Sequence, residues 1–395
     1  MFLRIKRCCL KRVLLKIVND KKETLAMILV NEPLLTGNEK KYLNECIDTG
    51  WISSEGPFIK MFEGLMAGCV ERKHGIAVCN GSVALDVAVV ALEIGKGDEV
   101  ILPSFTIISC AAAIVRAGAT PVLVDSDPIT WNMNVAHVEE KITSRTKAIM
   151  VVHIYGLPVD MDPILALAAK YNLKIIEDAA EMHGQTYNGR PAGSFGDIST
   201  FSFYPNKHIT TGEGGMILTD NEELADKCRS LRNLCFLPQQ RFFHEELGFN
   251  FRMTNLQAAL GVAQLERLKE FIQRKRKMGK YYADQLNQLD NIQIPQPSTS
   301  YAENIYWVFG IVLKQQVPFD AVEAIRKLQD EGIGSRPFFW PMHEQPVFKK
   351  MGLFINESYP VAENIARRGF YIPSGLALET PQLKTVSEAV IKILS

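Results

Sequence analysis

From residue 76 to residue 203, short apolar runs alternate with longer segments in which apolar residues recur every three to four positions. The short runs predict buried strands and the longer segments predict helices. Strands separated by helices favour an α/β fold with a mostly parallel sheet covered on both faces. The expected strands are residues 76–79, 99–102, 120–124, 148–153, 173–177 and 198–203, and the expected helices are residues 83–93, 107–117 and 163–171.

The pattern changes towards the C-terminus and predicts a second, smaller α+β domain. A helix should open near residues 220–226, and one long helix should cover residues 255–287. Beyond Pro295, residues 307–313 alternate like an edge strand, residues 320–331 look helical, and residues 336–348 are rich in proline and aromatics. A chain of 395 residues also exceeds the usual size of a single core. We therefore predict a large domain over residues 27–270 and a small one over residues 271–395.

Charge is unevenly distributed along the chain. Residues 1–26 carry eight Lys or Arg against Asp20 and Glu23, whereas the remainder carries 36 basic and 42 acidic residues. A mildly acidic body gives no electrostatic case for nucleic-acid binding. Lysines interrupt the apolar positions of the leader too often for a membrane span or a secretory signal. We interpret residues 1–26 as a basic extension without structure, with Met27 as the functional start.

The cysteine pattern predicts neither disulfides nor a metal site. The eight cysteines form no CxxC pair and no Cys/His cluster with the spacing of metal ligands. Several of them, such as Cys79 and Cys110, lie in apolar runs, where a reduced cysteine behaves as a small hydrophobic residue. This usage is typical of a reducing compartment, so we expect a cytoplasmic protein.

Lys207 is the strongest candidate for chemistry. It stands between the apolar run 198–203 and the Thr/Gly-rich stretch 210–215, and Asp178 ends another predicted strand 29 residues earlier. A lysine that can form a Schiff base and an aspartate that can keep a pyridinium nitrogen protonated are the minimum for pyridoxal phosphate (PLP) chemistry. The competing interpretations are a solvated turn lysine and a helix-capping aspartate.

A phosphate needs hydrogen-bond donors, and the turn around Gly81 and Ser82 can supply them. This turn opens a predicted helix, whose free N–H groups and positive dipole end suit an anion. Ser202, five residues before Lys207, could add a hydroxyl to the same group. Phe105 follows a strand end, where an aromatic ring could cover one face of the cofactor, although a core role fits it equally well.

Taken together, these motifs resemble the sugar-nucleotide aminotransferases of the DegT/DnrJ/StrS type, within the aspartate-aminotransferase-like fold-type-I PLP enzymes. The resemblance extends from about Met27 to the C-terminus. Residues 204–207 and 336–343 are most similar to the perosamine-synthase-type 4-aminotransferases. The motifs that carry the resemblance are Glu-Asp-Ala-Ala-Glu at 177–181, Phe-Ser-Phe-Tyr-Pro-Asn-Lys at 201–207, residues 210–215, and Asn-Phe-Arg-Met-Thr-Asn at 250–255.

The resemblance implies roles that the sequence pattern alone does not give. Glu181 should lie near the phenolic oxygen of the cofactor. Asn250 should reach across a dimer interface to the phosphate of the neighbour, which implies a homodimer with shared active sites. His343 and Arg336 should lie near the sugar nucleotide. Ile107 stands where many relatives place an aromatic over the ring, which is a departure from the family pattern.

The implied reaction is transfer of an amino group from glutamate to a nucleotide-linked 4-keto-6-deoxy hexose. A histidine in place of Lys207 would instead have indicated the related dehydratases. A 3-keto-sugar aminotransferase would share every motif named above, and a non-sugar PLP transferase also stays open. A catalytically silent PLP-binding regulator is the alternative from another class, although such a protein should have lost Lys207 or Asp178.

Overall fold

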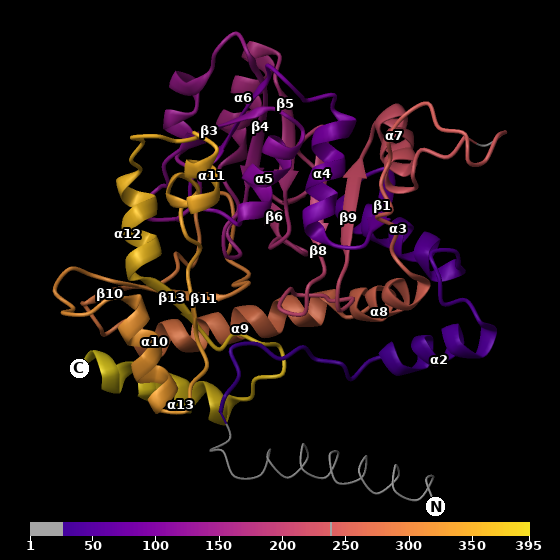
Figure 1. Cartoon of the computed structure of the whole chain (residues 1–395). Helices are drawn as coiled ribbons and strands as arrows, with labels where there is room; N and C mark the ends of the chain where they lie inside the picture. Colours follow the sequence, from indigo (N-terminus) through magenta and orange to yellow (C-terminus); the bar gives the residue numbers. More distant parts are fainter. Residues whose placement is uncertain (1–26, 238) are drawn as a thin grey trace, which may run out of the picture.

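The computed structural model describes residues 27–237 and 239–395, and the interpretation of residues 1–26 lies outside this part. A seven-stranded sheet forms its centre, with the order β1-β9-β8-β5-β4-β2-β3 (Figure 1). The pairs among β8, β5, β4, β2 and β3 are parallel, whereas β9 runs antiparallel to β8 and β1. The strands are β1 (His74–Val78), β2 (Glu99–Pro103), β3 (Thr120–Val124), β4 (Thr146–Val152), β5 (Lys174–Asp178), β8 (Ile198–Ser202) and β9 (Gly215–Thr219).

Helices cover both faces of this sheet, as the alternation of strands and helices predicts. Adjacent strand residues point to opposite faces, so Ile76 and Val78 join the core beneath α4, α5 and α7, while Ala77 joins the core formed with α3 and α8. The helix α6 packs over β4 on the same face as α3 and α8 but further along the sheet, because Ile149 and Val151 point to it. These helices are α2 (Glu39–Thr49), α3 (Pro57–Val70), α4 (Gly81–Ala91), α5 (Ile108–Arg116), α6 (Met161–Tyr171), α7 (Glu222–Arg232) and α8 (Asn255–Leu265).

A second, antiparallel sheet of four strands forms in the C-terminal part, in the order β10-β11-β13-β12. Its core takes residues from Met278 to Leu394. The elements of this part are α9 (Leu268–Leu286), β10 (Ile292–Gln293), β11 (Phe309–Leu313), α10 (Ala321–Asp330), β12 (Arg336–Pro337), α11 (Pro346–Lys350), α12 (Pro360–Arg368), β13 (Gly369–Ile372) and α13 (Thr380–Leu394). Short elements complete the chain: β6 (Thr186–Tyr187), β7 (Arg190–Pro191), η1 (Val135–His137), η2 (Glu139–Lys141) and η3 (Met342–Glu344).

The helix α9 connects the two cores. Its residue Phe271 belongs to the core of the large sheet and Met278 to the core of the small one, and in Figure 1 the helix runs beneath the large sheet towards α10 and α13. The first described residues also reach the C-terminal part, because the Ile28 N–H donates to the Gly332 carbonyl at 2.9 Å and the Ile28 carbonyl accepts from the Gly334 N–H at 2.8 Å. The segment at the start of the described chain therefore packs on the smaller unit.

Two predictions about elements are wrong. Residues 255–287 form two helices, α8 and α9, which separate at Glu266–Arg267 because α8 packs on α2 and α3 whereas α9 crosses to the second sheet. The predicted edge strand 307–313 is β11, which begins at Phe309, pairs on both sides and is buried at every residue. Within the described residues, we found no helix with the length and apolarity needed to cross a membrane.

Candidate active site

A cavity of about 680 Å³ opens where the parallel strands end at their carboxyl side. This edge of an open α/β sheet is where ligands commonly bind, because strand ends and helix N-termini converge there. The C-terminal part closes it from the other side with Trp307, Phe339 and Tyr371. Of the candidate residues from the sequence, the cavity brings together Gly81, Ser82, Asp178, Glu181, Ser202 and Lys207.

Lys207 lies in the connection between β8 and β9, where its N–H donates to the Tyr204 carbonyl at 2.9 Å. Its side chain is 11% exposed, and Nζ lies 3.9 Å from the centroid of the Trp307 ring and 3.7 Å from Glu181 Oε1. Burial lowers the pKa of the Lys207 amine from its ordinary value, although Glu181 and Asp178 oppose the shift. A lysine with a lowered pKa offers the neutral amine that a nucleophile needs.

Glu181 is held beside Lys207 by the backbone of the neighbouring loop. Tyr155 N–H donates to Glu181 Oε2 at 2.6 Å, which leaves Oε1 facing the lysine. Burial raises the pKa of Glu181 to about 8, against the opposing charge of Lys207. A carboxyl with this pKa can hold a proton near neutral pH, which is the property of a general acid or base.

Asp178 ends β5 and is almost fully buried. Oδ1 accepts from Ala180 N–H at 3.1 Å and Oδ2 accepts from the Cys110 thiol at 3.2 Å. Burial raises the pKa of Asp178, while these two donors and Lys207 stabilise its charged form. The carboxylate is therefore fixed in orientation at the base of the cavity.

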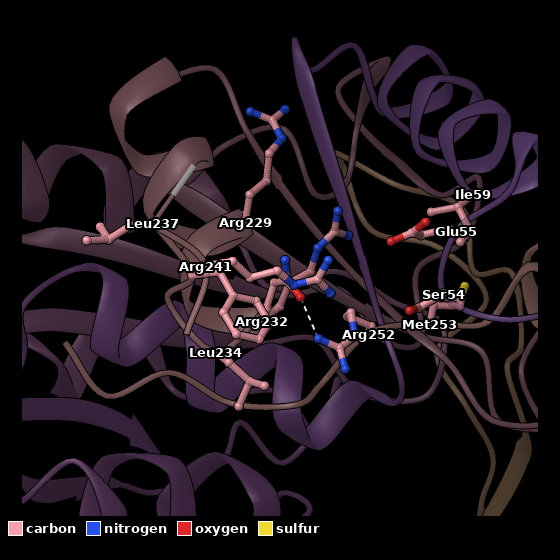
Figure 2. A pocket seen from close by; sticks show the side chains of 12 residues that line it. Ser54, Glu55, Ile59, Arg229, Arg232, Leu234, Leu237, Arg241, Arg252 and Met253 are labelled. Atoms are coloured by element: carbon pink, nitrogen blue, oxygen red, sulfur yellow. Dashed lines mark hydrogen bonds between the residues drawn. The ribbon is translucent and has the colours of Figure 1, made fainter. Parts of the chain in front are cut away.

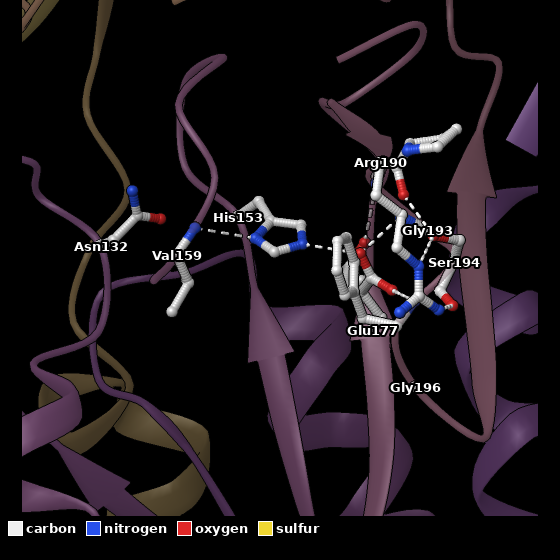
Figure 3. A network of polar contacts seen from close by, with 12 residues as sticks. Asn132, His153, Val159, Glu177, Arg190, Gly193, Ser194 and Gly196 are labelled. Atoms are coloured by element: carbon white, nitrogen blue, oxygen red, sulfur yellow. Dashed lines mark hydrogen bonds and ion pairs between the residues drawn. The ribbon is translucent and has the colours of Figure 1, made fainter. Parts of the chain in front are cut away.

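The adjacent Glu177 belongs to a separate network, because neighbouring strand residues point to opposite faces. Figure 3 shows this network around His153, whose Nδ1 accepts from Val159 N–H at 3.0 Å. The ring proton must then be on Nε2, which donates to Glu177 Oε1 at 3.0 Å. Burial raises the pKa of Glu177, but the His153 hydrogen bond and the N–H groups of Gly193 and Phe195 lower it below its ordinary value. These contacts anchor β5 and so fix the position of Asp178.

The N-terminus of α4 forms part of the cavity wall. Asn80 caps the helix by accepting from Val83 N–H at 3.0 Å, which leaves the N–H groups of Gly81 and Ser82 at the cavity. A Cβ on Gly81 would lie 2.7 Å from Ser202 Cβ, so the helix start and β8 meet here without room for a side chain. Two lining groups, the Thr200 hydroxyl and the Asn206 side-chain oxygen, are buried without a partner. A helix N-terminus, nearby hydroxyls and unpaired polar atoms fit a phosphorylated ligand.

The expected role of Phe105 in covering a cofactor ring does not fit its position. Its side chain is fully buried among aromatic rings, 6.0 Å from Tyr155 and 5.9 Å from Phe338 between ring centroids, and does not line the cavity. Thr106 and the half-exposed Ile107 line the cavity instead. The C-terminal part adds the aromatic rings of Trp307, Phe339 and Tyr371 to the lining, beside Phe201 and Tyr204 of the large domain. The sequence did not assign the first three to the site, because an aromatic residue in an apolar run first indicates the core.

His343 also lies outside the lining of the cavity, and its expected place near a substrate stays a prediction. It is buried, with Nδ1 2.8 Å from Ser104 Oγ and Nε2 3.0 Å from Glu363 Oε1. The side chain therefore ties the end of β2 to the start of α12. Arg336 differs, because it is exposed on β12 and lies opposite Tyr371, which does line the cavity.

Asn250 is exposed and lies away from the cavity of its own chain. It forms a bridge with Asn233, which lines a second cavity of about 640 Å³. Figure 2 shows that cavity, where Arg252 donates to Asn233. The other arginines that line it are Arg229, Arg232 and Arg241.

Residues 33–391 match the model of the DegT/DnrJ/EryC1/StrS aminotransferase family. The chain is 44% identical to GDP-perosamine synthase of Caulobacter vibrioides and 42% identical to that of Escherichia coli O157:H7, over 94% and 93% of this chain and 99% of each relative. It is 39% identical to UDP-N-acetyl-3-dehydro-alpha-D-glucosamine 3-aminotransferase of Acidithiobacillus ferrooxidans, over 85% of this chain and 88% of the relative.

The fold is similar to that of solved aminotransferases. The crystal structure of DesV from S. venezuelae superimposes with a TM-score of 0.84 at 33% identity, covering 91% of this chain and 94% of DesV. An aminotransferase from Psychrobacter cryohalolentis gives a TM-score of 0.86 at 30% identity, covering 91% of this chain and 97% of that protein. The fold, the cavity and the matched length lead to one conclusion: this chain belongs to the DegT/DnrJ/EryC1/StrS aminotransferase family.

Proposed function

We propose that this protein binds PLP in the cavity at Lys207 and transfers the amino group of glutamate to a nucleotide-linked 4-keto-6-deoxy hexose. The observation that carries the proposal is the presence of Lys207 and Asp178 in one cavity together with the N-terminus of α4. The relatives named GDP-perosamine synthase, at 42% and 44% identity over nearly their whole length, support the sugar assignment.

The lining residues fit the groups of PLP one by one. Lys207 would bond the aldehyde carbon, Asp178 would accept from the pyridinium nitrogen, and the start of α4 with Ser82 and Ser202 would receive the phosphate. Glu181 would lie near the phenolic oxygen. Bound in this way, PLP would supply an electron sink for the negative charge that develops on the carbon beside the transferred amine.

The residues of the chain would then move and hold protons around the reacting atoms. Lys207 Nζ would take the proton from the carbon of the amino donor, because burial favours its neutral form. Asp178 would keep its negative charge next to the ring nitrogen and so hold a proton there. Glu181, 3.7 Å from Nζ and with its pKa raised to about 8, would exchange a proton with the lysine between the two half-reactions.

Aromatic side chains would exclude water during these steps. Trp307 is 4% exposed and its indole covers the Lys207 amine. Phe339 and Tyr371 extend the same apolar wall. Arg336, exposed beside Tyr371, would offer a positive charge to the anionic part of the substrate.

We also propose a homodimer in which Asn250 of one subunit completes the site of the other. Its support is the exposure of Asn250 together with Phe242, Phe243 and Leu247 on the same segment, since exposed apolar residues that cluster mark interaction surfaces. Mixing Lys207→Ala protein with Asn250→Asp protein tests this arrangement. Shared sites predict that the mixture recovers activity that neither variant has, whereas independent sites predict no recovery.

A 3-keto sugar is the second candidate for the acceptor, because a relative at 39% identity is named a 3-aminotransferase. The sugar ring would need only a different orientation in the same cavity to present its C3 or its C4 carbonyl for amination. The lining residues do not decide between the two orientations. Incubation with glutamate and a panel of 3-keto and 4-keto nucleotide sugars separates the two. Product from a 3-keto substrate alone would overturn the proposed 4-amination.

The test of the whole proposal is Lys207→Ala. Without the amine, we expect loss of turnover and of the visible absorbance of the protein-bound cofactor. Wild-type protein with glutamate alone should change that absorbance, which a silent PLP-binding regulator would not do. Activity in Lys207→Ala would remove Lys207 from its role and with it the proposal.

A further inference from the structure

Lys275 is a buried lysine that the proposed chemistry does not use. It lies on α9, is 3% exposed, and has no carboxylate partner among the ion pairs of the described residues. Burial alone lowers its pKa to about 7. Burying an ammonium without a counter-charge is costly unless its donors are satisfied, so its contacts require an explanation.

The donors of Lys275 are satisfied by two backbone carbonyls of the C-terminal part. Nζ donates to the Trp307 carbonyl at 2.7 Å and to the Ser374 carbonyl at 2.5 Å. Trp307 lies just before β11 begins and Ser374 just after β13 ends, and these two strands are neighbours in the small sheet. Lys275 thus fastens the helix that connects the two cores to the segment that carries Trp307.

Trp307 is in turn fixed at its other end, next to Lys207. Its indole Nε1 donates to the Asn206 carbonyl at 2.8 Å, and its ring centroid lies 3.9 Å from Lys207 Nζ. An amine this close to an indole face has its charged form stabilised by the ring. The side chain of Lys275 therefore holds the backbone of Trp307, and the loop that carries Lys207 holds its indole ring.

We propose that Lys275 is a positioning residue for the active site: by holding the Trp307 carbonyl, it fixes the indole ring against the Lys207 amine. A hydrocarbon at position 275 would leave two buried carbonyls without donors, so the Trp307 segment would shift to find water or other donors. The ring would then move from the amine. This role of Lys275 rests on the proposed function of Lys207. Its test uses only the Lys207 amine and the Trp307 ring, so the result does not depend on which amino acceptor the protein uses.

The test measures the pKa of the Lys207 amine in the full-length protein after removal of the cofactor, from the pH dependence of its acylation, read by mass spectrometry of its peptide. Trp307→Leu should lower this pKa by roughly 0.4–1.5 units, since a cation–π contact contributes about 0.5–2 kcal/mol. Lys275→Met should shift it in the same direction, and the double variant should shift it no further than Trp307→Leu. Lys277→Met, exposed two residues along α9, should leave it unchanged.

The outcomes decide between positioning and plain structural support. A Lys275→Met protein with a lower melting temperature but an unchanged Lys207 pKa would overturn the proposal, and so would additive shifts in the double variant. Should Lys275→Met not fold, Lys275→Gln is the second variant, because its shorter amide keeps donors but cannot reach both carbonyls as the lysine does. A smaller shift in the same direction supports the proposal, and an unchanged Lys207 pKa in Lys275→Gln contradicts it.

Discussion

The thiol of Cys110 donates a hydrogen bond to Asp178 Oδ2 at 3.2 Å, between two groups that are both buried. Cys110 comes from α5 and Asp178 from the end of β5, so the contact joins a helix on one face of the sheet to the base of the cavity. Burial raises the pKa of Asp178, and the thiol is one of the donors that oppose this. The electrostatic state of the proposed ring anchor therefore depends on a residue outside the cavity lining.

Cys110→Ala should accordingly weaken cofactor retention. The substitution removes a hydrogen-bond donor from a buried carboxylate. This change raises the pKa of Asp178 further and destabilises its charged form by about 1–3 kcal/mol. We expect a higher dissociation constant for PLP, by roughly tenfold to a hundredfold, measured by titration of the cofactor-free protein. Cys110→Ser is the matched control, because a hydroxyl keeps the donor. Equal affinity in Cys110→Ala and wild type would show that the thiol has no influence on Asp178.

The sequence predicted the large sheet and the residues at its carboxyl edge because their signals are local. Lys207, Asp178 and Gly81 each lie at a turn directly after or before an apolar run, and the parallel topology then brings them into one cavity. Their roles are still predictions, but their convergence follows from the order of strands and helices.

The contributions of the C-terminal part could not be predicted, because they depend on how two cores pack together. Trp307 and Tyr371 lie in apolar runs, and nothing local separates an aromatic that faces a cavity from one in the core. The resemblance placed His343 near the sugar nucleotide, and nothing local in the sequence indicated that Ser104 and Glu363 would engage both of its ring nitrogens. The break at residues 266–267 carries neither proline nor glycine, so only the different packing partners of α8 and α9 explain it.

Gly81→Ala should disturb the proposed phosphate end of the site. An added Cβ would lie 2.7 Å from Ser202 Cβ and 3.1 Å from its Oγ, so β8 must shift at its end. Overpacking of this kind costs about 1–3 kcal/mol, and we expect a lower melting temperature with weaker PLP binding. Gly64→Ala on α3 is the matched control, because nothing lies within 4 Å of its Cβ. That variant should be as stable as wild type or more so, since alanine is favoured in a helix by about 0.5–1 kcal/mol.

His183 should make the protein labile to acid. Its ring is buried against Phe201 and Phe203 with both nitrogens unpaired, and burial lowers its pKa from 6.5 to about 3. The unfolded chain therefore binds a proton below pH 6.5 that the folded protein does not, and stability falls as the pH falls from 6.5 towards 3. This residue alone should cost about 2 kcal/mol between pH 6.5 and 5.

His183→Leu should remove that part of the acid lability. We expect the free energy of unfolding, measured with urea at pH 7.5, 6.5, 5.5 and 5, to decline less steeply in the variant than in wild type. The comparison isolates His183, because the carboxylates that also protonate in acid are common to both proteins. Parallel declines would mean that the ring finds a partner or water in solution.

Glu181 should have the opposite pH dependence, because its shift has the opposite sign. Its pKa is about 8 in the fold against 4.5 ordinarily, so the folded protein without cofactor binds the extra proton. Its contribution to stability is present below pH 4.5 and is lost as the pH rises through 8. Glu181→Gln keeps an oxygen for Tyr155 N–H but cannot ionise. Relative to wild type, the variant should therefore gain unfolding free energy between pH 4.5 and 8, by at most about 1.4 kcal/mol per pH unit.

The same substitution should change the chemistry in a way that stability alone would not. Glu181 raises the pKa of Lys207, so its replacement should lower the pKa of that amine further. Acylation of Lys207 in cofactor-free Glu181→Gln should then reach its maximum rate at a lower pH than in wild type. Unchanged acylation and a stability curve parallel to wild type would together show that the carboxyl and the amine do not share a proton, and the proposed exchange between them would be lost.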